Sequence, residues 1–155
     1  MEERISYRQV PGELLGAMMQ IEHYLGQSGL DVKMLNLMRY YVSQLNNCAY
    51  CLDMHFKEAL AGGEELVRLH SVGAWRDTDY YSRQEQALLA WAETVTRLDK
   101  QAEQQTQEFD ELRRYFSLKQ IAQLTLAVTQ INSWNRLVKA FHFRPGRYQV
   151  KGAGA

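Results

Sequence analysis

Two cysteines and a histidine stand close together in this sequence. Cys48, Cys51 and His55 are separated by three and four residues, and the chain has no other cysteine. On an α-helix this spacing places both sulfurs and the imidazole on one face. Free backbone N–H groups and the helix dipole favour the thiolate at a helix start, and an imidazole exchanges protons near neutral pH. The cluster therefore predicts thiol chemistry assisted by a base.

Other interpretations of the cluster stay open. Two cysteines and a histidine are three possible zinc ligands, but a structural zinc site needs a fourth. The remaining histidines, His23, His70 and His142, form no second cluster. The cysteines could also pack as small apolar residues, and His55 could be a hydrogen-bonded core histidine. We predict neither a metal ligand set nor a cofactor, and keep structural or zinc-bound cysteines as an alternative.

Length and charge limit the class of protein. The chain has 155 residues, a mass of 18.0 kDa and equal numbers of basic and acidic residues, 18 of each. This length suits one domain over residues 1–155, and zero net charge argues against a nucleic-acid partner. Residues 1–10 lack the apolar core of a secretory signal, and the longest apolar run, 87–92, is too short for a bilayer. We expect a cytoplasmic protein that does not bind membranes.

Apolar residues recur at helical spacing almost throughout, which predicts an all-α fold. The motif lies at the start of a core helix that ends at Gly62-Gly63, and Asn46-Asn47 is expected to close one helix and cap the next. Ser82 and Ser117 each begin a capping box, and Thr106 is expected to cap a short helix. The expected helices run from about 11 to 26, 31 to 46, 48 to 60, 64 to 71, 83 to 98, 106 to 115 and 118 to 141, with loops at 73–81 and 99–105.

The motif and its surroundings resemble a known family. The matching residues are the run 42–55 (VSQLNNCAYCLDMH), Lys57-Glu58-Ala59, Ser71 with 74–78 (AWRDT), 88–93 (LLAWAE) and 131–137 (INSWNRL). Together they are similar to the alkylhydroperoxidase AhpD-like branch of the carboxymuconolactone decarboxylase family. The resemblance implies an all-helical fold that oligomerises, commonly as trimers or as hexamers built from dimers.

The resemblance also implies a role for each residue of the motif. Cys51 would be the peroxidatic cysteine that attacks the hydroperoxide, and Cys48 would resolve the resulting sulfenic acid as a disulfide. His55 would act as the base in a proton relay. These roles agree with the chemistry of thiols, because a sulfenic acid condenses readily with a thiol one helical turn away.

Two positions depart from the AhpD pattern. A glutamate twelve residues before the first cysteine joins the relay in AhpD enzymes, but Asn36 stands there in this chain and exchanges no proton near neutral pH. Glu22, Glu58 and Glu93 are candidates to replace it. Tyr50 stands where those enzymes have a histidine, and it either shapes an apolar pocket or packs in the core. Decarboxylase members lack the cysteine pair, so their activity does not transfer.

The predicted function is thiol-dependent reduction of organic hydroperoxides or hydrogen peroxide, as part of antioxidant defence. A thiol, lipoyl or thioredoxin-like reductant would reopen the Cys48–Cys51 disulfide. One alternative is a general thiol–disulfide oxidoreductase or redox sensor. The other is a non-catalytic oligomeric module.

Overall fold

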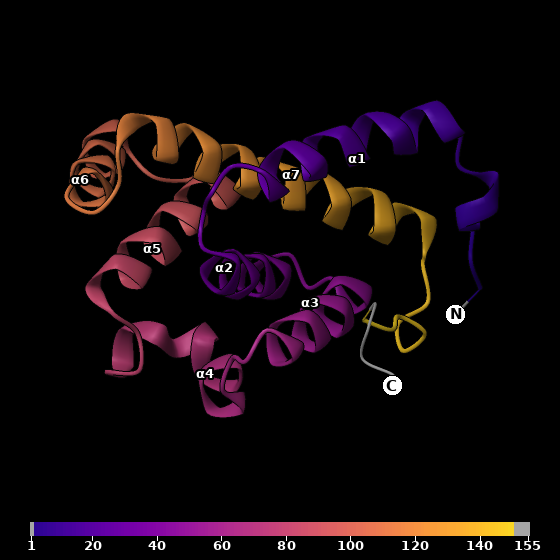
Figure 1. Ribbon diagram of the computed structural model, residues 1–155, viewed down its shortest axis with the longest axis horizontal. Coiled ribbons are helices and arrows are strands. Elements are labelled where there is room, and N and C mark those ends of the chain that lie inside the picture. Colours follow the sequence, from indigo (N-terminus) through magenta and orange to yellow (C-terminus); the bar gives the residue numbers. More distant parts are fainter. Residues whose placement is uncertain (1, 151–155) are drawn as a thin grey trace.

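The computed structural model describes residues 2–150, which form helices and no strand (Figure 1). The predicted all-α fold is therefore confirmed. No helix in the described part of the chain is long and apolar enough to cross a membrane. The elements are η1 (Tyr7–Gln9), α1 (Gly12–Gly26), α2 (Val32–Leu45), α3 (Ala49–Ala61), α4 (Leu66–Ser71), η2 (Val72–Asp77), α5 (Arg83–Arg97), α6 (Ala102–Arg113) and α7 (Leu118–Phe141).

Helix α2 is the centre of the fold. It packs against α3, α5 and α7, and Figure 1 views it nearly end-on among them. Val42, Leu88 and Leu124 belong to one buried apolar cluster, which joins α2 to α5 and α7. Leu37 and Leu69 belong to a second cluster, which joins α2 to α3 and α4. Each such side chain contributes about 1.5–3 kcal/mol when buried. The second cluster includes Ala59 of α3, so it holds the helix that carries the cysteine motif against α2.

Local capping signals locate two helix starts correctly. The capping boxes predicted at Ser82 and Ser117 both form, with Glu85 and Gln120 as the side chains that return to the cap. These contacts lie within four residues of one another, so the sequence alone specifies them. The long last helix, Leu118–Phe141, has the predicted bounds.

Two segments differ from the prediction. Helix α6 begins at Ala102 rather than at Thr106, because the Thr106 hydroxyl donates to the Ala102 carbonyl at 2.9 Å inside the helix instead of capping it. Part of the loop expected at 73–81 is the short helix η2. Both differences lie away from α3, so they leave the site unchanged.

Candidate active site

The cysteine motif occupies the first turns of α3. Cys48 is the residue that precedes the helix, Cys51 lies in its first turn and His55 lies one turn further on. All three side chains are buried. The sulfurs of Cys48 and Cys51 form a disulfide, with their Cα atoms 5.3 Å apart. The motif therefore stands at the start of a core helix, as predicted, and it is in the oxidised state.

A tight turn connects α2 to the motif. Asn46 ends α2 as expected, but Cys48, and not Asn47, occupies the N-cap position that directly precedes α3. Asn47 instead adopts a positive φ of 50°, a conformation that asparagine tolerates better than most residues. The Cys48 N–H donates to the Ser43 carbonyl at 3.0 Å. This turn sets the position of the first cysteine.

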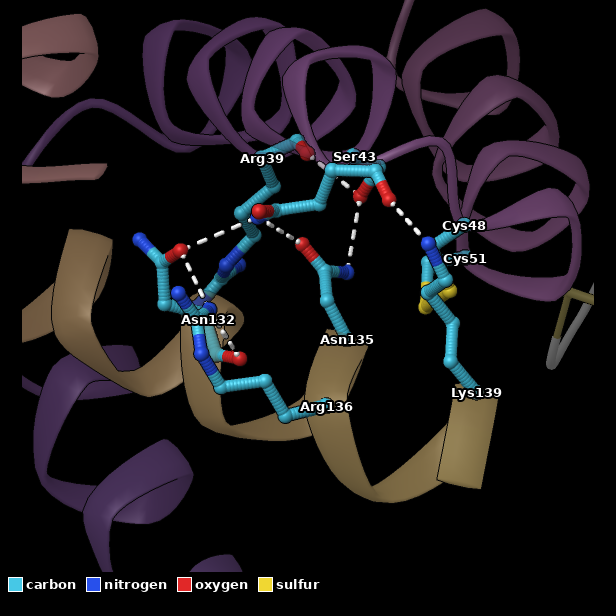
Figure 2. The surroundings of a disulfide bond; sticks show 9 residues. Arg39, Ser43, Cys48, Cys51, Asn132, Asn135, Arg136 and Lys139 are labelled. Carbon is cyan, nitrogen blue, oxygen red and sulfur yellow. Dashed lines mark hydrogen bonds between the residues drawn. A yellow bond between two sulfur atoms is a disulfide. The ribbon is translucent and has the colours of Figure 1, made fainter. Parts of the chain in front are cut away.

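Polar side chains of α7 hold this turn in place. The Asn46 amide donates to the side-chain oxygens of Asn132 at 2.9 Å and Asn135 at 2.7 Å. Asn135 in turn donates to the Ser43 hydroxyl at 3.3 Å, and Lys139 Nζ donates to the Asn46 carbonyl at 2.7 Å. Figure 2 shows Asn135 reaching from α7 to Ser43 on α2, with Asn132 on one side of it and Lys139, near the disulfide, on the other. The sequence predicts no role for these residues, although asparagines among the apolar positions of a long helix are a signal of such a network.

A cavity of about 520 Å³ lies beside Cys51. Helices α1, α2, α3 and α7 form its walls together with residues from both ends of the chain, and most of its lining is apolar or aromatic. Cys51 and His55 both line the cavity, whereas Cys48 does not. Tyr50 also lines it and packs edge-on against Phe143, with ring centroids 5.7 Å apart. The lining residues are Tyr7, Met19, Glu22, Arg39, Tyr50, Cys51, Met54, His55, Glu58, Ile131, Trp134, Val138, Phe143 and Tyr148.

His55 is oriented by a carboxylate on its own helix. Its Nδ1 lies 2.8 Å from Glu58 Oε2, and the Tyr148 hydroxyl donates to Glu58 Oε1 at 2.6 Å. An ionised carboxylate only accepts hydrogen bonds, so Nδ1 carries a proton, and in the neutral form of this imidazole the lone pair is on Nε2. Nε2 is buried and has no hydrogen-bond partner within residues 2–150. The imidazole is therefore arranged to accept a proton at Nε2.

Electrostatics keep Glu58 ionised and Tyr148 neutral. Burial by itself raises the pKa of Glu58, but the hydrogen bond and the charge of His55 outweigh it together with the hydrogen bond from Tyr148 and the charge of Arg39, and the pKa falls below its usual 4.5. Burial and the neighbouring Glu58 carboxylate raise the pKa of Tyr148 well above its usual 10. At neutral pH the carboxylate accepts and the phenol donates.

The other two glutamates proposed for the relay lie elsewhere. Glu22 lines the same cavity, but its carboxylate is bound to Arg39 at 3.0 Å and to Trp134 Nε1 at 2.9 Å. Glu93 is paired with Arg76 at 2.8 Å and does not line the cavity. Of the three candidates, only Glu58 contacts the histidine of the motif.

Asn36 lies outside the cavity, near the far end of α3. Its Nδ2 would be 3.6 Å from a Cβ added at Gly62, the residue that ends the helix. Cys51 stands at the opposite end of α3. The departure from the AhpD pattern at Asn36 is thus separated from the sulfurs by most of a helix, and Glu58 supplies a carboxylate nearer to them.

The zinc alternative requires several suitable ligands in one place. The described residues contain no group of three or more His, Cys, Asp and Glu side chains placed to hold a metal ion. The two cysteines are bonded to each other. In this disulfide form, residues 2–150 offer no zinc site.

Known proteins resemble this chain in sequence and in fold. The model of the carboxymuconolactone decarboxylase family matches residues 12–94. The uncharacterized Bacillus subtilis protein YdfG is 34% identical over 137 residues, which cover 88% of this chain and 92% of YdfG. A crystal structure from Agrobacterium tumefaciens, of a protein of unknown function with a suggested AhpD role in antioxidant defence, is 33% identical with a TM-score of 0.88. That match covers 95% of this chain and 100% of the other.

A more distant likeness concerns the fold alone. The debrominase Bmp8, in a structure with 2,3,4-tribromopyrrole, is 19% identical and has a TM-score of 0.75. The match covers 87% of this chain and 72% of Bmp8. A debrominase therefore shares this arrangement of helices, and function has to be argued from the site itself.

Proposed function

This chain belongs to the AhpD-like branch of the carboxymuconolactone decarboxylase family, and we propose that it is a thiol-dependent hydroperoxide reductase. One observation carries the proposal. Cys51 and His55 line the same apolar cavity, while Cys48, the disulfide partner of Cys51, lies outside its lining. A small substrate in the cavity would contact Cys51 and His55. Cys48 is bonded to Cys51 but does not line the cavity.

The first step oxidises Cys51. In the reduced protein its thiol gives a proton to His55 Nε2, and the negative charge of Glu58 stabilises the imidazolium that forms. The thiolate attacks the terminal oxygen of the hydroperoxide and the O–O bond breaks. The alcohol leaves with the proton that His55 returns, and Cys51 becomes a sulfenic acid.

The second step forms the disulfide. The Cys48 thiol attacks the Cys51 sulfur, the S–S bond forms and water leaves. An external dithiol, or two monothiols, then reduces the disulfide to two thiols and is itself oxidised. The reductant in this proposal is a low-molecular-weight thiol, a lipoyl group or a thioredoxin-like protein.

The cavity supports an organic hydroperoxide as the substrate. Apolar and aromatic walls stabilise an alkyl or aryl group by burial, which hydrogen peroxide cannot exploit. Both cysteine residues are at most 1% exposed, which suits a small substrate that enters the cavity. Antioxidant defence, a cytoplasmic location and a trimeric or hexameric assembly belong to the same proposal.

A single-turnover reaction tests the proposal. Fully reduced, metal-free protein is mixed with one equivalent of cumene hydroperoxide, and peroxide loss and disulfide formation are followed together by rapid quench and mass spectrometry. We expect rapid stoichiometric disulfide formation. Oxidation no faster than that of free cysteine would show the proposal to be wrong.

Two variants assign the roles of the sulfurs. Cys51→Ser should abolish peroxide loss, because it removes the attacking thiolate. Cys48→Ser should still consume one equivalent and stop at a sulfenic acid that dimedone traps. Full activity in Cys51→Ser with none in Cys48→Ser would reverse the assignment.

A further inference from the structure

The segment after α7 returns across the start of α3 (Figure 1). It turns at Gly146, whose φ is +93°, and the Gly146 N–H donates to Asp53 Oδ2 at 3.0 Å. Lys57 Nζ donates to the Tyr148 carbonyl at 3.0 Å. Both Asp53 and Lys57 belong to α3, so the helix that carries the cysteines also holds this segment. The result is that Tyr148 forms part of the cavity wall.

The Tyr148 hydroxyl binds the carboxylate oxygen of Glu58 that does not contact His55. One oxygen, Oε1, accepts from Tyr148 at 2.6 Å, and the other, Oε2, contacts His55 Nδ1 at 2.8 Å. The terminal torsion of a glutamate side chain has a broad energy minimum, so one hydrogen bond leaves the carboxylate plane loosely defined. A second bond on the opposite oxygen fixes that plane, and with it the direction from which Nδ1–H is accepted.

We propose that Tyr148 is a positioning residue for the peroxidase reaction: through Glu58 it holds His55, which lines the cavity together with Cys51, as the tautomer whose Nε2 is unprotonated. The inference rests on the proposed function. It is supported by the state of Nε2, which is buried and has no partner within residues 2–150 while the disulfide is formed. Reduction supplies the Cys51 S–H one helical turn away as a donor.

The hydroxyl also affects the charge of Glu58. The charged and titratable groups around Glu58 are His55 on α3, Arg39 on α2 and Tyr148, and Glu22 on α1 lines the same cavity while paired with Arg39. Burial raises the pKa of Glu58, and the bond from Tyr148 is one of the contacts that lower it. Without the hydroxyl, fewer contacts oppose the effect of burial, so the pKa of Glu58 would rise and the carboxylate would take up a proton at a higher pH.

Tyr148→Phe keeps the aromatic ring and removes only this hydroxyl. We expect single-turnover peroxide loss to slow about fivefold to tenfold, the effect of one lost hydrogen bond to a charged group. The acid side of the rate profile should move to higher pH. Tyr80→Phe is the matched control, since Tyr80 is exposed and its hydroxyl makes no hydrogen bond within the described residues. This control should leave both the rate and the pH profile unchanged.

Nitrogen-15 NMR of the His55 ring gives a readout that does not depend on peroxide. The wild type should show the Nδ1–H form, and Tyr148→Phe should show a mixture of both tautomers. His55→Gln identifies the signal by its loss. If the wild type reduces no peroxide but the tautomer still changes in Tyr148→Phe, the proposed function fails and the positioning role stands.

Other outcomes would overturn the inference. A folded Tyr148→Phe protein with an unchanged rate, pH profile and tautomer contradicts it, and so does a slower rate with an unchanged profile and tautomer. If Tyr148→Phe does not fold, Gly146→Ala takes its place, because alanine is strained at φ +93° and shifts the turn while the hydroxyl remains. It should change the rate, profile and tautomer in the same directions, and no change in a folded Gly146→Ala protein would contradict the inference.

Discussion

His55 Nδ1 lies 2.8 Å from Glu58 Oε2, and both residues belong to the helix that carries the two cysteines. The imidazole and the carboxylate that contacts it therefore stay in register with the sulfurs whenever α3 moves as a rigid element. AhpD enzymes, which this chain resembles, place the relay glutamate at the position of Asn36. Here the carboxylate comes from the motif helix itself, so Asn36 does not by itself deprive the site of an orienting carboxylate.

Glu58→Gln should slow the oxidation of Cys51. A neutral amide still occupies the space, but it does not stabilise the imidazolium that forms when His55 takes the thiol proton. We expect the single-turnover rate at pH 7 to fall about tenfold to a hundredfold. Rapid-quench measurement of peroxide loss with cumene hydroperoxide checks this prediction.

Two further substitutions make the Glu58 experiment specific. Glu65→Gln removes a charge from an exposed glutamate at the start of α4 and should leave the rate unchanged. Glu22→Gln changes the other carboxylate of the cavity. A large loss of rate in Glu22→Gln, together with a normal rate in Glu58→Gln, would mean that the relay runs through Glu22 instead.

The acid stability of the fold should depend on Glu58 and Glu85. Burial raises the pKa of each, but hydrogen bonds outweigh it, from His55 to Glu58 and from Arg68 and Ser82 to Glu85, so both pKa values fall below the usual 4.5. A carboxyl whose pKa is lowered on folding stabilises the protein above its unfolded pKa, and this stabilisation is lost as the pH falls through the folded value. The wild type should therefore lose stability below about pH 4.5.

Urea unfolding at pH 6 and at pH 3.5 measures this loss. Glu58→Gln and Glu85→Gln should each be less stable than the wild type at pH 6, and the difference should shrink at pH 3.5. Equal differences at the two pH values would mean that these carboxylates do not ionise with the lowered pKa values that their contacts produce.

The sequence predicts features of this protein that depend on near neighbours. The spacing of Cys48, Cys51 and His55 places them on one helix, and the capping boxes at Ser82 and Ser117 define helix starts, because each of these signals spans only a few residues. The predicted helix start at Thr106 is wrong, because a threonine hydroxyl can also donate a hydrogen bond to a carbonyl inside a helix.

Contacts between distant parts of the chain could not be predicted. Tyr148 meets Glu58 across 90 residues of sequence, and Asn135 meets Asn46 across 89. These contacts depend on how α7 packs against the end of α2 and how the segment after α7 packs against α3, which no local pattern specifies. The same packing decides that Cys51 lines the cavity and Cys48 does not. Glu58 could be named from its place after the motif, but its contact with His55 had to come from the structure.

Asn135→Ala should destabilise the turn before the motif. Asn135 is fully buried, and the change removes an acceptor from the Asn46 amide and a donor from the Ser43 hydroxyl. We expect the free energy of unfolding to fall by about 1–3 kcal/mol, the cost of buried polar groups left without partners. Disulfide formation should slow more than peroxide loss, because Cys48, the residue after this turn, loses its fixed position.

Urea denaturation and the two phases of the single-turnover reaction measure these effects. Ser133→Ala is the matched control on α7, since Ser133 is exposed and its hydroxyl contacts only the carbonyl of Thr129 within its own helix. If Asn135→Ala slows peroxide loss and disulfide formation equally, the network does not act through the position of Cys48.

Met19→Trp should separate large from small peroxides. Met19 is 52% exposed on α1 and lines the cavity, so a tryptophan there narrows the space while its ring can remain partly in solvent. We expect the second-order rate constant for cumene hydroperoxide to fall about tenfold, which corresponds to the loss of about 1.4 kcal/mol of apolar contact. The rate constant for hydrogen peroxide should stay the same, because that molecule does not use the apolar walls.

Leu14→Trp places the same new side chain on the same helix, outside the cavity lining. Leu14 is 37% exposed, so the larger ring has access to solvent there too. This variant should leave both rate constants unchanged, which separates an effect on the cavity from an effect of an added indole on α1. Equal losses for both peroxides in Met19→Trp would instead show that the change disturbs Cys51 or His55, and the argument that the apolar walls select organic hydroperoxides would fail.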